Sequence, residues 1–211
     1  MPSPIDSPLD PSLAPSLDPS FDPATAALPA LAGQIVATHH AFCRSELPAL
    51  VAELRQAIPQ ARPEEAPELR QLLGGFDNIA GALLQHLIKE ETLLFPLITA
   101  IDTALRNHTP PPRSTFGSVG NPIRMMVLEH SEAEVLLAKL RQTTHGFQAP
   151  AGATPAIAAL YERVRAFDAD MQRHVELEDK FLFPRAIAIE KEAAEKEAAE
   201  RKAAGRATLG Q

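Results

Sequence analysis

The chain has few of the features that mark secreted and membrane proteins. A single cysteine, Cys43, occurs among its 211 residues, so no intramolecular disulfide can form, and a reducing cytoplasm is the expected location. Apolar runs such as residues 93–98 are short and contain Pro96, and none is long enough for a membrane span. Residues 1–23 contain no Lys or Arg, unlike the positively charged start of a signal peptide. We therefore expect a soluble, cytoplasmic protein with no membrane partner.

Excess positive charge and alternating sequence patterns are also missing. The chain carries 20 basic and 27 acidic residues, a formal net charge of −7, which argues against a nucleic-acid partner. No segment alternates apolar and polar residues with period two over a useful length, so strands are not expected. The length still allows one buried core. These observations favour an all-α domain.

Prolines and glycines divide most of the chain into four long helical segments. The predicted helices cover about 24–58, 67–106, 122–145 and 155 to beyond Pro184, joined by short to medium loops. Such helices form an antiparallel four-helix bundle, whose two halves look like copies of one hairpin. We predict three regions: a disordered leader rich in proline and aspartate (1–23), the bundle (24–187), and a charged Ala/Glu/Lys helical tail (188–211).

One segment of the chain occurs twice. Residues 86–96 return 88 positions later as residues 174–184, with His, Glu, Leu, Phe and Pro at the same offsets. A His and a Glu four residues apart lie on one face of a helix, and two such pairs are what a two-metal site inside a bundle needs. Pro96 and Pro184 each remove a helical hydrogen bond, which predicts a kink just beyond each pair.

The remaining two helices also place a histidine on their apolar seam. His40 lies on a stripe with Leu47, and His130 on a stripe with Met126 and Leu137. A carboxylate in a core is costly unless it is paired or coordinated. Four imidazoles with two carboxylates suit iron, manganese or zinc and fit calcium or magnesium poorly. The predicted metal ligands are His40, His86, Glu90, His130, His174 and Glu178.

The predicted ligand set leaves room for a small molecule. If both glutamates bridge, each metal has two His and two carboxylate oxygens, and an oxo or hydroxo bridge makes five ligands with one position open. The general affinity order alone favours zinc over iron. A single His-x-x-x-Glu pair is usually a surface pair worth about 0.2–0.5 kcal/mol, but two copies on seams favour a metal site.

Three nearby residues have alternative interpretations. His39 could replace His40 if the first helix is rotated, although a supporting or surface position is favoured. Glu134 follows His130 by four residues and could be a third carboxylate, although it lies at the edge of the seam. Cys43 is interpreted as a small core residue.

The motifs together resemble a known family. Residues 38–48, 86–96, 126–130 and 174–184 are similar to the hemerythrin-like domain of the iron–sulfur cluster repair di-iron proteins, the repair-of-iron-centres (YtfE-like) family. The resemblance covers about residues 30–187, and the Leu-Pro that follows His-x-x-x-Arg in the first helix favours the repair family. Longer members carry an N-terminal domain with paired cysteines, whereas this sequence has the leader in its place.

The resemblance implies a function. It implies a non-haem di-iron centre that protects or repairs iron–sulfur clusters damaged by nitric oxide or oxidants, through iron donation, which is not enzymatic, or reaction with nitric oxide. Nitric oxide, oxygen and damaged iron–sulfur proteins are the expected partners. The alternatives are a binding or sensing module for oxygen, nitric oxide or iron, and a structural bundle with the tail as its interaction arm. In the implied arrangement His40 and His86 serve one iron, His130 and His174 the other, and Glu90 and Glu178 bridge them.

Overall fold

The computed structural model describes residues 20–112 and 114–209. Residues 1–19 of the predicted leader lie outside this described part. Within it the chain forms helices and loops but no strand, as predicted. In chain order the helical segments are α1 (Leu28–Ile35), η1 (Val36–His40), α2 (Ala41–Ala57), η2 (Ile58–Gln60), α3 (Ala66–Lys89), η3 (Glu90–Leu94), α4 (Phe95–Arg106), α5 (Gly120–Thr143), α6 (Pro155–Leu177), η4 (Glu178–Leu182) and α7 (Phe183–Leu209).

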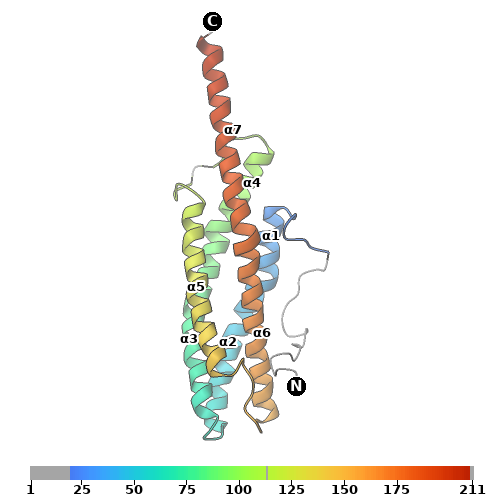
Figure 1. The fold of residues 1–211 in the computed structure, drawn as a ribbon, viewed down its shortest axis with the longest axis vertical. Helices are drawn as coiled ribbons and strands as arrows, with labels where there is room; N and C mark the ends of the chain where they lie inside the picture. The colour runs from blue at the N-terminus through green and yellow to red at the C-terminus, as the bar shows by residue number, and fades with distance from the viewer. Residues whose placement is uncertain (1–19, 113, 210–211) are drawn as a thin grey trace.

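These segments join end to end into four antiparallel rods, which confirms the predicted four-helix bundle (Figure 1). The first rod runs from α1 to η2, the second from α3 to α4, the third is α5, and the fourth runs from α6 to α7. The α2 helix packs on α3 and α6, α3 packs on α5, and α4 packs on α7. Among the described residues, no helix combines the length and apolarity needed to cross a bilayer.

The apolar core is divided into two parts along the bundle. One core is built around Phe76, Phe147 and Phe167 and lies between α2, α3, α5 and α6, the helices that form the lower part of the bundle in Figure 1. The other core is built around residues such as Ile35 and Phe183, from α1, α4, the start of α5 and the start of α7. In every rod the predicted ligands fall in sequence at or beside the boundary between these two parts. A polar layer is therefore held between two apolar ones.

Three π-helical turns interrupt the rods at this layer. Two of them, η3 and η4, begin at Glu90 and Glu178 themselves, so the irregularity starts at the predicted ligands and not just beyond them. The N–H of Phe95 donates to the carbonyl of Glu90, five residues back, and Phe183 bonds Glu178 in the same way. The proline after each phenylalanine has no N–H to donate, and π turns often accompany functional positions in helices.

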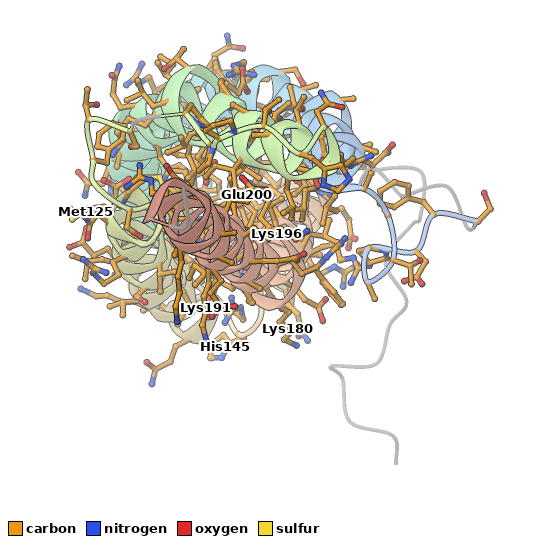
Figure 2. The ribbon with its side chains drawn as sticks, turned by 90° about the horizontal axis from the view of Figure 1, so that it is seen from above. Met125, His145, Lys180, Lys191, Lys196 and Glu200 are labelled. Carbon is orange, nitrogen blue, oxygen red and sulfur yellow. The ribbon has the colours of Figure 1, made fainter. Side chains whose placement is uncertain are left out.

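The end of the fourth rod extends beyond the rest of the bundle (Figure 1). Lys191, Lys196 and Glu200 are exposed on α7, which Figure 2 shows from above. Lys196 pairs with Glu192 one turn away at 2.9 Å. Nearer the bundle, Glu190 accepts hydrogen bonds from the N–H of Val119 at 2.7 Å and the hydroxyl of Ser118 at 2.6 Å. A carboxylate at this position stabilises the start of α5.

Candidate metal centre

All six predicted ligands meet in the polar layer. They form two groups in which the nitrogen and oxygen atoms lie within 4.8 Å of one another, and both groups contain Glu90 and Glu178. Each of the six residues is at most 5% exposed. The members of the groups are His40, Glu90, His174 and Glu178 in one, and His86, Glu90, His130 and Glu178 in the other.

The histidines pair differently from the arrangement implied by the resemblance. His40 faces His174, with 3.0 Å between the two Nε2 atoms, and His86 faces His130 at 3.1 Å. The implied pairing of His40 with His86, and of His130 with His174, is therefore wrong for this structure. The physical reason is helix packing, because the first rod contacts the fourth beside η1 and α3 packs on α5.

The two glutamates lie between the histidine pairs. Glu90 Oε2 is 3.3 Å from His86 Nε2 and 3.5 Å from His40 Nε2, so this carboxylate reaches both pairs. Glu178 uses both oxygens, with Oε1 3.0 Å from His174 Nε2 and Oε2 3.1 Å from His130 Nε2. Each glutamate is thus positioned to bridge two cations.

Burial and charge act strongly on these carboxylates. Burial raises the pKa of Glu90, and the nearby charge of Glu178 raises it further. Burial also acts to raise the pKa of Glu178, but the facing histidines, His174 first, overcome it and hold that pKa well below its usual range. Both oxygens of Glu90 are buried without a hydrogen-bond partner among the described residues. Orphaned oxygens of this kind are rare in proteins, and a cation satisfies them.

Carboxylates on the outer side of three histidines fix the direction of the rings. His40 Nδ1 lies 2.7 Å from Glu91 Oε1, and His86 Nδ1 lies 2.8 Å from Glu129 Oε2. His130 Nδ1 lies 3.0 Å from Asp179 Oδ1. A ring that donates from Nδ1 presents the lone pair of Nε2 inward, which is how metal-binding histidines are held. Two inward lone pairs at the short spacings found here repel unless a proton or a metal cation lies between them, so the residues fit a metal pair.

The fourth histidine has different surroundings. His174 is fully buried, and its Nδ1 has no hydrogen-bond partner among the described residues. The His39 ring stacks on it, with centroids 5.9 Å apart, and His39 Nδ1 lies 2.6 Å from Asp170 Oδ1. Cys43 lies beside them, its thiol 4.0 Å from Asp170 Oδ2 and 3.6 Å from the sulfur of Met171. Burial raises the pKa of the Cys43 thiol, which keeps it protonated.

The structure places the three residues that had alternative interpretations outside both ligand groups. His39 is buried but belongs to neither ligand group, and it supports the site through Asp170 and His174. Glu134 is exposed and pairs with Arg141 at 3.3 Å, away from both groups. Cys43 is a buried core residue, as predicted.

Sequence reasoning missed the outer carboxylates. Glu91 and Asp179 directly follow the predicted ligands Glu90 and Glu178, and Glu129 directly precedes His130. Neighbouring residues on a helix point about 100° apart, so each of these carboxylates turns toward a histidine on an adjacent rod. An acidic residue next to a seam ligand is the signal that could have revealed them.

A helical bundle with two overlapping His/Glu groups defines a hemerythrin-like protein, and residues 121–206 match the model of the Hemerythrin HHE cation binding domain. The iron-sulfur cluster repair protein YtfE of Edwardsiella ictaluri (strain 93-146) is 34% identical over 162 residues, 77% of this chain and 67% of the relative. YtfE of Enterobacter sp. (strain 638) is 29% identical over 167 residues, 79% of this chain and 69% of the relative. The chain belongs to this iron–sulfur cluster repair protein family. It spans about two thirds of the length of these relatives.

Proposed function

We propose that residues 24–187 form a unit that binds two iron ions. His40 and His174 hold one ion, His86 and His130 hold the other, and Glu90 and Glu178 bridge them. The observation that carries this proposal is the pair of overlapping ligand groups that share both glutamates. The orphaned Glu90 oxygens support it further. Iron, in preference to zinc or manganese, is supported by family membership.

The protein acts, in this proposal, in the repair of iron–sulfur clusters damaged by nitric oxide or oxidants in the cytoplasm. The relatives are named for cluster repair. When bound, a di-iron pair with six protein ligands supplies an open position for a small molecule and a source of iron. The chain's own contribution is to hold the imidazoles by Glu91, Glu129 and Asp179 and to bury the six side chains between the two apolar cores.

Metal content is the first test. The full chain, purified without chelator, is expected to contain close to two irons and to absorb in the near ultraviolet like an oxo-bridged pair. Glu178→Ala is expected to lose most of this iron because it removes a ligand common to both groups. Glu176→Ala is the matched control, since Glu176 lies two residues away and pairs with Arg173 and Lys180 at the surface. A wild-type chain that folds but takes up no metal pair would reject the proposal.

Two modes of repair give different results. A centre that reacts with nitric oxide consumes it anaerobically in the reduced state, and Glu178→Ala abolishes this consumption. A centre that donates iron restores a cluster on an apo iron–sulfur scaffold protein to which sulfide is added, without consuming nitric oxide.

The alternative function is an oxygen, nitric oxide or iron binding or sensing module. The hemerythrin-type match favours it. Reversible oxygen binding with neither nitric oxide consumption nor cluster restoration would select this alternative.

A further inference from the structure

The two histidine pairs of the centre differ in how they are enclosed. His40 and His174 are both 0% exposed, whereas His86 is 4% and His130 is 5% exposed. These exposed fractions differ by only a few per cent, but the two histidines that are partly exposed face each other on one side of the centre. They indicate that one pair lies deeper in the bundle than the other.

Two open clefts lead to the shallower pair. A cleft of about 630 Å³ between α5 and α6 is lined by His130 and Asp179. A second cleft of about 400 Å³ between α3 and α5 is lined by His86, Glu129 and again His130. Neither of these clefts is lined by His40 or His174. Both therefore reach the centre at the same histidine pair.

The first cleft also offers a carboxylate to a cation that approaches the centre. Asp179, which is hydrogen-bonded to the His130 ring, has 32% of its side chain exposed. Glu134 and Glu176 line the same cleft, but each is paired with basic side chains, Glu134 with Arg141 and Glu176 with Arg173 and Lys180. Asp179 therefore places a carboxylate at the inner end of this cleft, beside the ring of a predicted ligand, and hard divalent cations prefer oxygen donors of this kind.

The deeper pair is enclosed by packed side chains. Behind His174 lie Cys43, His39 and Asp170, which are all at most 2% exposed. The His40 ring stacks on Phe95, with centroids 5.6 Å apart. The carboxylate outside His40, Glu91, is paired with Arg44 at 2.6 Å, and Glu129 outside His86 is paired with Lys89 in the same way, so the two sides differ in packing and not in charge. A metal ion leaving on this side would have to displace these groups.

We propose that the two metal positions are kinetically inequivalent: the position at His86 and His130 exchanges its ion through the clefts, and the position at His40 and His174 retains its ion. This inference rests on the proposed function and deepens it. One ion is delivered or replaced at the cleft side, while the deeper ion keeps Glu90 and Glu178 in place. The exchanging species is a divalent cation, here Fe²⁺.

Release kinetics test the proposal. The full chain is loaded with Fe²⁺ anaerobically and mixed with an excess of the chromogenic chelator ferrozine. We expect two phases of equal amplitude, one iron per chain in each, with rates at least tenfold apart. A single phase that releases both ions would overturn the inference.

Substitutions in the clefts assign the fast phase. Ala133 lines both clefts, so the larger side chain of Ala133→Leu narrows both approaches and is expected to slow the fast phase several-fold with the slow phase unchanged. Ala82→Leu, at an exposed position of the second cleft, gives a variant that leaves the core untouched. Ala52→Leu, exposed on α2, is the matched control and leaves both phases unchanged. A fast phase that neither cleft variant alters would contradict the proposed route.

Ligand variants assign the two positions directly. His86→Ala is expected to retain about one iron per chain, released only in the slow phase. His40→Ala is expected to retain no slowly released iron. Slow release surviving in His40→Ala, or fast release surviving in His86→Ala, would reverse the assignment and reject it. These outcomes are distinct from failure of the proposed function, in which the wild-type chain would not bind two irons at all.

Discussion

At the residue scale, three carboxylates hold the site histidines from outside. The side chain of Asp179 is hydrogen-bonded to His130 Nδ1 at 3.0 Å, and Asp179 directly follows the predicted ligand Glu178 in the sequence. Such partners fix the tautomer and orientation of a ligating imidazole and raise its basicity. These three acidic residues, which lie next to Glu90, His130 and Glu178 in the sequence, therefore belong to the site as much as the predicted ligands do.

Asp179→Asn should weaken metal binding without unfolding the chain. Removing an outer carboxylate typically costs roughly 10–100-fold in metal affinity, and we expect a loss in this range for the ion at His130. Competitive chelator titration measures it. The control is Glu176→Gln, which changes a carboxylate in the same cleft that touches no histidine in the described structure. An equal loss in both variants would show that the effect comes from the charge of the cleft and not from the His130 hydrogen bond.

At the element scale, the repeated segment places a phenylalanine ring on a site histidine in each half of the bundle. Phe95 stacks on His40, and Phe183 stacks on His130 with centroids 5.9 Å apart and ring planes 8° apart. Each phenylalanine immediately follows a π turn. The wider turn lets the glutamate that begins it and the phenylalanine that follows it both face the interior, where both are buried.

Phe183→Leu should destabilise the metal-free chain while keeping the fold. The variant retains an apolar side chain but loses the ring contact, which is worth about 0.5–1.5 kcal/mol beyond area burial. Urea unfolding of the metal-free protein should show a loss of at least this size. Phe116→Leu is the control because Phe116 is 39% exposed in the α4–α5 loop. Equal stability of the two variants would exclude an energetic role for the stacked ring.

The connection between α2 and α3 contains a pH-dependent contact. Glu65 accepts hydrogen bonds from the Arg62 side chain at 2.7 Å and the Arg62 N–H at 3.0 Å, and these bonds lower the pKa of the Glu65 carboxyl. A lowered folded pKa means that this stabilisation is present above the unfolded pKa, about 4.3, and is lost as the pH falls through the folded value.

Glu65→Gln should therefore be less stable than the wild type at pH 7, and the difference should shrink in strongly acidic solution. Urea unfolding at the two pH values measures this. Glu64→Gln is the matched neighbour, because the Glu64 side chain is 63% exposed and 3.4 Å from Arg62. A difference that persists unchanged at low pH would show that the Glu65 charge is not its source.

At the scale of the whole molecule, sequence periodicity predicted the rods and the six residues at the centre. The prediction succeeded because the apolar seam of a helix can be read from the sequence of that helix alone, and each predicted ligand lies on the seam of its own helix. The pairing of His40 with His174 could not be predicted, because it depends on which rods are neighbours. The turn at Glu90 was also missed, because a π turn depends on the missing proline N–H and on packing together. Local pattern determines which residues face inward, and tertiary packing determines what they meet.

The bundle carries a layer of buried charge between its two apolar cores, and this layer couples stability to metal. Glu90 and Glu178 are both 0% exposed, so without cations they lose hydration and repel each other. Metal bound only by the folded chain adds RT ln(1 + [L]/Kd), about 2.7 kcal/mol when the free metal is 100-fold above Kd.

Glu90→Gln should stabilise the metal-free chain and weaken the stabilisation that metal provides. The amide removes one buried charge, so the metal-free variant should unfold at a higher temperature than the metal-free wild type, but it should gain little on addition of Fe²⁺. Thermal unfolding of both proteins, each with and without anaerobic Fe²⁺, provides the four unfolding temperatures that the comparison needs. The control is Glu132→Gln, an exposed residue of α5, which should follow the wild type in both states. A metal-free Glu90→Gln that is less stable than the wild type would mean that Glu90 is held by protein contacts. In that case the layer would be a structural feature of the bundle, and not a site whose charge is kept for metal.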